Sequence, residues 1–154
     1  MSKKLPNYIS AQIIAILRIS SSTRIALLNS PSFLFLVPYL SKEPSFIQTI
    51  TTLLFFDEKN LFLPLKHAIV VLVQNENKNT INVIHAIMQR LNNDYELNVS
   101  LLQQLIQILI AIIPFALPEI LVSVTHDVIK FIVHPSQFIH NTTLQYISSI
   151  AYKK

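Results

Sequence analysis

The sequence predicts an all-α protein, and three observations support this fold class. The 154-residue chain contains no glycine, although tight β-hairpins, Rossmann turns and P-loops need it for positive φ angles or close backbone approach. Apolar residues make up 51% of the chain, and they recur at the spacing of helices. Charged residues make up only 13%, about half of the usual fraction. This low charge indicates extensive burial, or surfaces that a missing neighbour covers.

Periodicity, prolines and polar corners divide the chain into nine predicted helices. We expect them at approximately residues 6–19, 24–30, 31–42, 44–56, 63–73, 79–91, 98–113, 117–133 and 136–152. Thr23 is expected to cap the second helix and Ser30 the third, which has Pro31 at its first position. Pro38 is expected to kink the third helix or to confine it to its first turns. Pro64 is expected to open the fifth helix.

Apolar side chains three or four residues apart mark the helix faces that we expect to be buried. The predicted inward residues are Ile9, Ile13, Ile16 and Leu17 in the first helix, Phe33, Leu34, Val37 and Leu40 in the third, Phe46, Ile47, Ile50, Leu53 and Leu54 in the fourth, Ile84, Ile87, Met88 and Leu91 in the sixth, and Phe138, Ile139, Leu144, Ile147 and Ala151 in the last. The chain length fits one domain over residues 1–154.

The longest apolar run contains residues 105–124, which are numerous enough for a membrane span of about 20 residues. Three features oppose insertion. Glu119 would cost about 2.5 kcal/mol or more inside hydrocarbon. Pro114 and Pro118 each remove a backbone donor, and the chain lacks the glycines through which membrane helices pack. We therefore expect two buried helices joined at the corner PFAL. A membrane-embedded helical protein with a span near 105–124 is the alternative.

One unit recurs along the chain: a helix that begins at proline, a polar corner, and a longer helix with an apolar face. Residues 46–56 align with residues 81–91 at a separation of about 35, and residues 138–151 form a later copy. Repeats of this length are typical of helical solenoids, because one helix pair cannot cover its own apolar face. The sequence therefore predicts about four stacked repeats, with an irregular α-helical bundle as the alternative.

Within residues 11–56 the chain resembles the armadillo repeat. A long third helix, AQIIAILRIS, leads into a short first helix, STRIALLNS, which a second helix, PSFLFLVPYLSK, and another third helix, PSFIQTITTLL, follow. The resemblance is looser over residues 61–91 and 117–152. Ser30 replaces the usual glycine, and beyond Asp57 the short first helix is missing, which is nearer to HEAT repeats.

The resemblance implies a right-handed superhelical solenoid that begins within one third helix and ends on another. A fragment of a longer repeat array, or ends that dock on a partner, would account for the low charge content.

In armadillo-like proteins the third helices line a concave groove that binds extended peptides. Carried over to this chain, the resemblance implies a polar ladder of Gln48, Thr52, Asn82, His85, Gln89, Gln103, Gln107, Asn141 and Gln145. Amide side chains can donate and accept hydrogen bonds along a peptide backbone. The alternative is that these residues are only the solvated faces of amphipathic helices. Armadillo proteins of the nuclear-import type bind basic signals through a ladder of tryptophan and asparagine side chains. The chain has no tryptophan, so a nuclear-import receptor is disfavoured.

No catalytic, cofactor or metal site is predicted. The chain lacks a His-Glu-x-x-His motif, a paired-carboxylate helix and a Ser/His elbow. His126, His134 and His140 form the closest group of histidines, but spacings of eight and six residues do not place them on one helical face. We therefore expect a protein that is not an enzyme and has no small-molecule substrate.

The charge pattern also limits the partners. The net charge is +4, with lysine pairs at residues 3–4 and 153–154 and no basic run elsewhere. Nucleic-acid binding needs a clustered basic surface, which this sequence lacks, so no nucleic-acid partner is expected. A nucleic-acid-binding repeat protein is the third hypothesis. The absence of cysteine is consistent with the cytosol. The sequence predicts a cytoplasmic scaffold or adaptor that binds a protein or peptide partner.

Overall fold

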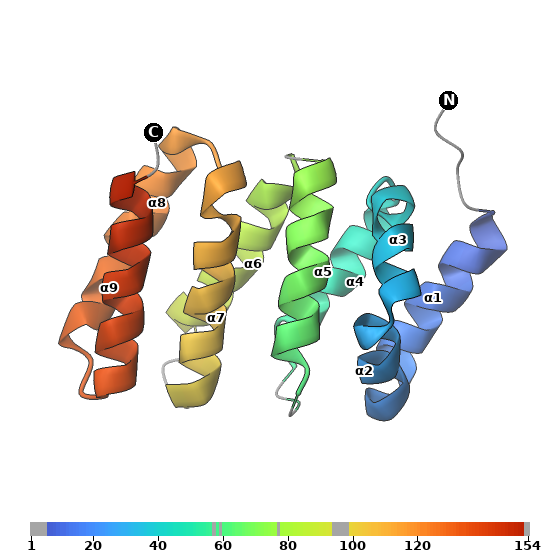
Figure 1. Cartoon of the computed structure of the whole chain (residues 1–154), viewed down its shortest axis with the longest axis horizontal. Coiled ribbons are helices and arrows are strands. Elements are labelled where there is room, and N and C mark those ends of the chain that lie inside the picture. The colour runs from blue at the N-terminus through green and yellow to red at the C-terminus, as the bar shows by residue number, and fades with distance from the viewer. Residues whose placement is uncertain (1–5, 57, 59, 77, 94–98, 153–154) are drawn as a thin grey trace. The chain divides into compact units, whose positions relative to one another are not determined.

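The computed structural model describes residues 6–56, 58, 60–76, 78–93 and 99–152; the two lysine pairs near the termini lie outside them. Within these ranges the chain forms nine α-helices and two short 3-10 helices, without a strand (Figure 1). The all-α prediction is therefore confirmed. The chain divides into two compact units, residues 1–79 and 80–154.

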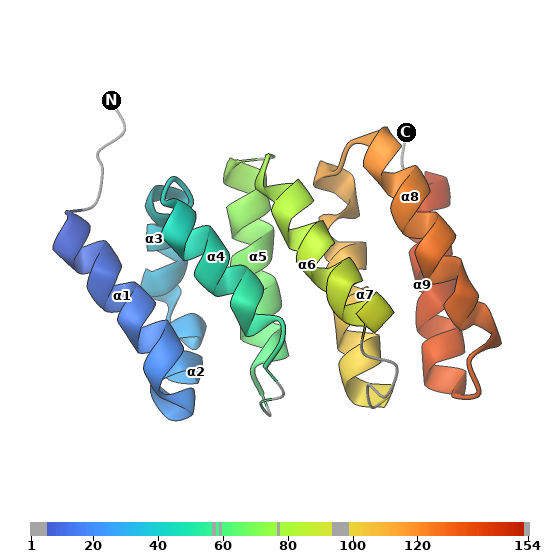
Figure 2. The same cartoon turned by 180° about the vertical axis from the view of Figure 1, so that it is seen from behind.

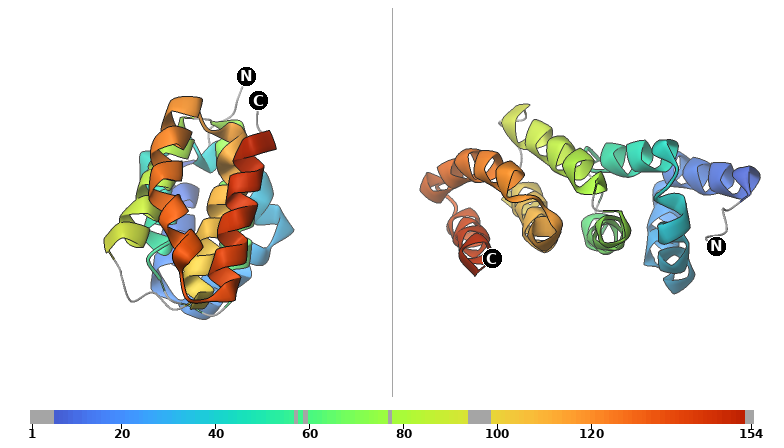
Figure 3. Two further views of the ribbon diagram at one scale, coloured as in Figure 1. Left: turned by 90° about the vertical axis from the view of Figure 1, so that its left-hand side faces the viewer. Right: turned by 90° about the horizontal axis from the view of Figure 1, so that it is seen from above.

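The first unit contains five helices in two layers. These are α1 (Asn7–Ile19), α2 (Ser21–Asn29), α3 (Pro31–Leu40), α4 (Pro44–Leu53) and α5 (Phe62–Asn75). Helices α1 and α4 lie side by side in one layer, and α2, α3 and α5 form the other (Figures 1 and 3).

The core of the first unit lies between its two layers. Leu17 of α1, Val37 of α3, Phe46 of α4 and Leu65 of α5 have no exposed surface. The rings of Phe33 and Phe46 pack against each other with their centres 6.3 Å apart. Burial of these side chains provides the main stabilisation of the two layers, at about 1.5–3 kcal/mol for each large apolar side chain.

The inward faces predicted for this unit are largely confirmed. All five residues predicted for α4 are buried. In α1 the pattern is partly met, since Ile13 and Leu17 are buried whereas Ile9 and Ile16 are half-buried. In α3, Leu34 is also half-buried. Helix α5 begins at Phe62, so that Pro64 lies within its first turn instead of opening it.

The capping predictions differ from the structure in one respect. Helix α2 begins at Ser21, and the N–H of Arg24 donates to the carbonyl of Ser20 over 2.8 Å. Ser20, with its extended backbone, is therefore the N-cap, and the prediction of Thr23 was wrong. Ser30 does precede α3, although its side chain makes no capping hydrogen bond. Pro38 lies inside α3, which ends two residues later.

The turn before α5 contains a residue in a backbone conformation that glycine usually adopts. Asn60 has a φ of 68°, in the left-handed region where glycine is the usual residue. Asparagine tolerates this conformation better than most side chains because its short amide can bond locally. Asn60 thus allows the chain to reverse direction ahead of α5.

The second unit also has two layers. Its elements are α6 (Asn79–Asn93), α7 (Val99–Ile112), η1 (Ile113–Phe115), α8 (Pro118–Val128), η2 (Ile129–Val133) and α9 (Gln137–Tyr152), with the first residue of α6 counted in the first unit. Helices α7 and α9 pack side by side in one layer, while α6 and α8 lie in the other (Figures 2 and 3).

The long apolar run is divided as predicted. Helix α7 has 14 residues, a length of about 21 Å at 1.5 Å per residue, which is less than the hydrocarbon core of about 30 Å. Pro114 lies in η1, and the extended backbone of Leu117 precedes Pro118 at the start of α8. None of the helices in the described part of the chain combines the length and the hydropathy that a membrane span needs. Leu105, Ile106 and Leu109 are instead buried within the protein.

The buried face of α9 differs from the prediction. Phe138 and Leu144 were expected to be inward but are 67% and 43% exposed, and Ala151 is also exposed. Ile147 is half-buried. The buried residues at helical spacing are Ile139, Thr142, Thr143 and Tyr146.

Local hydrogen bonds explain this difference. The hydroxyls of Thr142 and Thr143 donate to the carbonyls of Phe138 and Ile139, each over 2.8 Å. These hydroxyls are therefore satisfied within the helix and can be buried. The two threonines are therefore core residues, and the buried face of α9 does not include Phe138.

A side-chain hydrogen bond joins α8 to this buried face. The hydroxyl oxygens of Tyr146 and Thr125 lie 3.1 Å apart. Burial raises the pKa of Tyr146 above its usual value of 10.0, and the hydrogen bond with Thr125 partly opposes this rise. Tyr146 is therefore a neutral core residue that carries a satisfied polar group.

Candidate interaction surface

The predicted polar ladder begins in the first unit on the outward side of α4. Gln48 and Thr52 are exposed, whereas Thr49 beside them is fully buried. The hydroxyl of Thr52 donates to the carbonyl of Gln48 over 2.8 Å. The Gln48 amide makes no hydrogen bond to another described residue. Gln48 therefore offers both a donor and an acceptor to a ligand, whereas the hydroxyl proton of Thr52 is already engaged.

Helix α1 adds a positive charge to the same layer. The guanidinium Nε of Arg18 donates to the hydroxyl of Thr49 over 3.2 Å. Arg18 is exposed at the last turn of α1, and Thr49 is the buried neighbour of Gln48. This hydrogen bond holds α1 and α4 together at the edge of the polar surface. Sequence reasoning missed Arg18, because the contact joins residues that are far apart in the chain.

In the second unit the ladder is clearest on α6. Asn82, His85 and Gln89 are exposed, and Ile84 and Ile87 on the opposite side are buried. Spacings of three and four residues place the three polar side chains on one face of the helix. None of these three side chains hydrogen-bonds to another residue in the described part of the chain. This face can therefore exchange hydrogen bonds with a ligand.

The remaining residues of the ladder lie in the other layer of this unit. Gln103 and Gln107 on α7 are half-buried, and Asn141 and Gln145 on α9 are exposed. Because α7 and α9 lie behind α6 and α8 in Figure 2, these four residues do not share a layer with those of α6. Asn141 also accepts a hydrogen bond from Gln137 over 3.0 Å. The structure thus distributes the predicted ladder of this unit over two layers.

The helix that shares a layer with α6 is α8, and sequence reasoning did not assign it a role. Glu119, Ser123 and His126 are exposed on α8, and Lys130 is exposed on η2. The ammonium of Lys130 donates to the side-chain oxygen of Asn92 on α6 over 3.1 Å. The outward faces of α6 and α8–η2 therefore meet on one surface. The spacing of these polar residues along residues 119–130 was the signal that could have identified this face.

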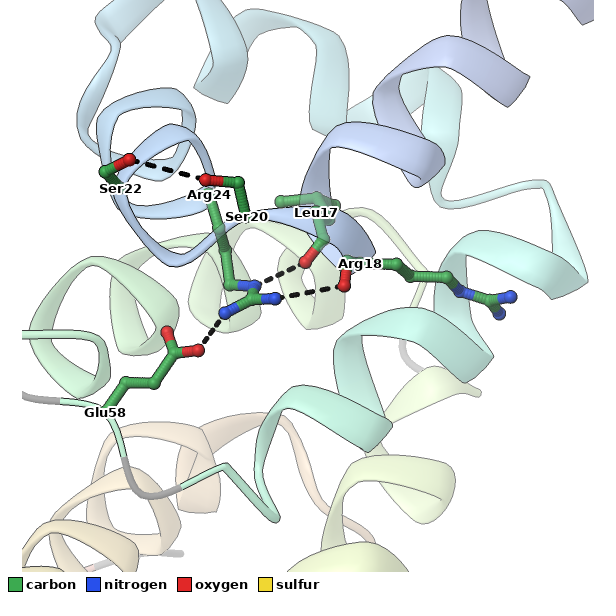
Figure 4. Close-up of polar contacts among 6 residues, drawn as sticks. All are labelled: Leu17, Arg18, Ser20, Ser22, Arg24 and Glu58. Carbon is green, nitrogen blue, oxygen red and sulfur yellow. Dashed lines mark hydrogen bonds and ion pairs between the residues drawn. The ribbon is translucent and has the colours of Figure 1, made fainter.

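The buried arginine of the first unit has a structural role. Arg24 is 3% exposed, and its Nε donates to the carbonyl of Leu17 at the end of α1 (Figure 4). Its second terminal nitrogen donates to the carbonyl of Arg18 over 3.1 Å. These two carbonyls belong to the last turn of α1, where helix acceptors have no partner of their own. Arg24 therefore caps α1 from the following helix.

The charge of Arg24 is balanced from the segment before α5. Glu58 forms an ion pair with the guanidinium, and the ring of Phe56 lies 4.7 Å from its central carbon. A buried charge is tolerated when it is paired and fully hydrogen-bonded. Because these contacts occupy the guanidinium, Arg24 stabilises the fold and does not form part of the exposed surface.

The histidines of the second unit make only local contacts. Nδ1 of His134 accepts the backbone N–H of Ser136 over 3.0 Å, and Nδ1 of His140 donates to the carbonyl of Ile132 over 2.8 Å. His126 lies beside Asp127. Over the described residues no three metal-ligating side chains of His, Cys, Asp or Glu come together.

No protein-family model matches the chain, and neither a curated protein nor a solved structure matches it. The function is therefore inferred from the residues of the chain itself.

Proposed function

We propose that this protein is a non-enzymatic scaffold or adaptor of the cytoplasm that binds a segment of a protein partner along its outward helical layers. The observation that carries the proposal is the outward face of α6. Three side chains at helical spacing, Asn82, His85 and Gln89, are exposed there without a hydrogen-bond partner in the described chain. They stand opposite a face that is buried in the core.

The chemistry of this face suits a peptide backbone. An amide side chain donates through its nitrogen and accepts through its oxygen, and a backbone offers one acceptor and one donor per residue. Gln48 on α4 presents the same chemistry in the first unit. We therefore assign the binding surface to α4 in the first unit and to α6 in the second. The amide side chains of α7 and α9 are not part of this surface.

The arrangement that would connect such surfaces is a right-handed solenoid of armadillo/HEAT-like repeats. Within each unit, helices adjacent in sequence pack into two layers, as repeats of this kind do. Helices α1 to α4 follow the order that the armadillo resemblance predicts: a long third helix, a short first helix, a second helix and another third helix. Helix α5 follows α4 without a short helix between them in the described residues, as in HEAT repeats.

The proposal is tested by comparing two pairs of substitutions that each add two carboxylates to one helix of the second unit. The first variant carries Asn82→Asp and Gln89→Glu on α6, and the second carries Gln103→Glu and Gln107→Glu on α7. Both variants and the wild-type chain are immobilised, and the proteins they capture from a cell extract are compared by quantitative mass spectrometry.

We expect at least one partner to be captured by the wild type and by the α7 variant and lost from the α6 variant. Circular dichroism confirms that both variants keep their helix content. Equal recovery of every protein by the three chains would contradict the proposed surface.

A further inference from the structure

Helices α1 and α4 of the first unit contain one charged residue between them, Arg18. Its side chain is exposed in the last turn of α1, and Figure 4 shows it directed away from the buried pair of Arg24 and Glu58. No acidic side chain in the described ranges forms an ion pair with Arg18. Glu43, the residue before α4, lies about 9 Å from Thr49 along the helix axis. The charge of Arg18 is therefore not balanced within the described chain.

Two hydrogen bonds fix the position of Arg18. Its main-chain carbonyl accepts from the guanidinium of Arg24 over 3.1 Å, and its own Nε donates to the hydroxyl of Thr49 over 3.2 Å. That hydroxyl is held in turn, because it donates to the carbonyl of Ser45 over 2.8 Å. An arginine that is already restrained loses less conformational entropy when it binds a ligand. The terminal nitrogens of Arg18 make no hydrogen bond to another described residue, so their N–H groups can bind that ligand.

The guanidinium of Arg18 lies at the edge of the exposed face of α4. At 3.6 residues per turn, Thr52 and Gln48 lie about 60° and 100° around the helix from Thr49, in the same direction. Both are exposed. Leu53 lies about 40° from Thr49 in the other direction and is buried. Thr49, which holds Arg18, therefore marks the border between the buried face of α4 and the face that carries Gln48.

We propose that Arg18 selects the partner of this surface by pairing with a carboxylate, the side chain of an aspartate or glutamate in the segment that α4 binds. The two terminal nitrogens of a guanidinium match the two oxygens of a carboxylate. Gln48 hydrogen-bonds to the backbone of the same segment. One fixed cation balances one negative charge, whereas proteins that recognise phosphorylated segments use clusters of arginine. This inference rests on the proposed function and adds the chemistry of its partner.

The test begins with a displayed library of random decapeptides, from which binders are selected on the immobilised full chain and on its Arg18→Gln variant. We expect the peptides selected by the wild type to share an aspartate or glutamate at one aligned position, and those selected by Arg18→Gln to lack this preference. Lys78→Gln is the matched control, because it removes the same charge from an exposed residue outside α1 and α4. It should select the same peptides as the wild type.

The most enriched acidic peptide is then labelled with fluorescein, and its affinity is measured by fluorescence anisotropy. Companion peptides carry glutamine or phosphoserine in place of the shared acid. Arg18→Gln should lower the affinity for the acidic peptide about fivefold, the effect of an exposed ion pair, and leave the affinity for the glutamine peptide unchanged. Arg18→Lys keeps the charge without the planar fork, so its loss should be smaller. Circular dichroism confirms that the variants keep their helix content.

Three outcomes would overturn the proposal. The first is a wild-type selection without a shared acid, and the second is an equal loss of affinity in Arg18→Gln and Lys78→Gln. The third is tighter binding of the phosphoserine peptide than of the acidic peptide, which would assign Arg18 to a phosphorylated segment instead of a carboxylate.

Failure of this inference is distinguishable from failure of the proposed function. Gln48→Ala should weaken the acidic and the glutamine peptide equally, because the amide bonds to the backbone that both share. If Gln48→Ala weakens both peptides while Arg18→Gln weakens neither, the proposed function holds and selection of an acidic segment is excluded. If the wild type selects no peptide, or if neither variant changes any affinity, both proposals fail.

Discussion

Arg24 and Glu58 form an ion pair that joins helix α2 to the segment before α5. The side chain of Arg24 is 4% exposed and that of Glu58 is 22% exposed. The same guanidinium caps the last turn of α1 through the carbonyls of Leu17 and Arg18. One side chain of α2 therefore connects α1 and the segment before α5 to its own helix.

Replacement of Arg24 by methionine should destabilise the first unit by about 3 kcal/mol. The change leaves Glu58 without its cation and two helix carbonyls without a donor, and removal of one partner of a buried pair costs about 3–5 kcal/mol. Partial exposure of Glu58 places the expected value at the low end. The measurement is the urea dependence of the circular dichroism signal. Arg18→Met is the control, because Arg18 is exposed and its loss should cost less than about 1 kcal/mol. Equal losses for the two variants would contradict the role of Arg24.

The stability of the second unit should decrease in alkali because of Tyr146. Burial raises the pKa of Tyr146 above 10.0, whereas the unfolded chain releases this proton near the ordinary value. The contribution of Tyr146 is therefore fully present below pH about 10 and is lost as the pH rises through the folded-state pKa. Urea midpoints measured from pH about 8 to about 11 should fall more steeply for the wild type than for Tyr146→Phe.

The control variant Tyr146→Phe should itself be less stable than the wild type at neutral pH. Loss of the hydrogen bond to Thr125 should destabilise the protein by about 1 kcal/mol. If the variant and the wild type show the same alkaline slope, Tyr146 is not buried as the structure describes.

Truncation of two neighbouring residues of α9 should change the free energy of unfolding to very different extents. Ile139 has no exposed surface and Phe138 is 67% exposed. Ile139→Ala should cost about 2–5 kcal/mol through lost burial and the cavity it leaves. Phe138→Ala should change the free energy of unfolding by about 0.5 kcal/mol or less. Thermal and urea unfolding of both variants measure the difference, and a larger loss for Phe138→Ala would show that α9 is turned the other way.

These residues also show where sequence reasoning succeeds and where it fails. The buried faces of α4 and α6 were predicted because their apolar residues recur three or four positions apart, with polar residues on the opposite side of the helix. The face of α9 was not, because Thr142 and Thr143 count as polar in the pattern while their hydroxyls bond within the helix. Hydropathy alone cannot register a polar group whose partner is the preceding turn.

Contacts between residues far apart in the chain were the second feature that the sequence could not predict. Arg24 finds its partner 34 residues away, and Lys130 contacts Asn92 at a separation of 38 residues. No local pattern predicts such pairs. The same limit explains the polar ladder, because helical periodicity places Gln103 and Asn82 on polar faces without saying in which layer each helix lies.

The proposed solenoid makes a prediction about size in solution. A compact globule of 154 residues would have a radius of gyration of about 15 Å. Stacked repeats extend along one axis, so small-angle X-ray scattering should give a larger radius and a distance distribution with a long tail. A symmetric distribution with a radius of about 15 Å would favour the irregular bundle.

The proposed function requires that the outward faces of α4 and α6 bind a partner segment. The most direct measurement is backbone amide NMR of the isotopically labelled chain, recorded while the captured partner is added. We expect the signals of residues around Gln48, and of Asn82, His85 and Gln89, to shift with the partner's concentration. Shifts confined to α7 and α9, or a spectrum that does not change, would contradict it.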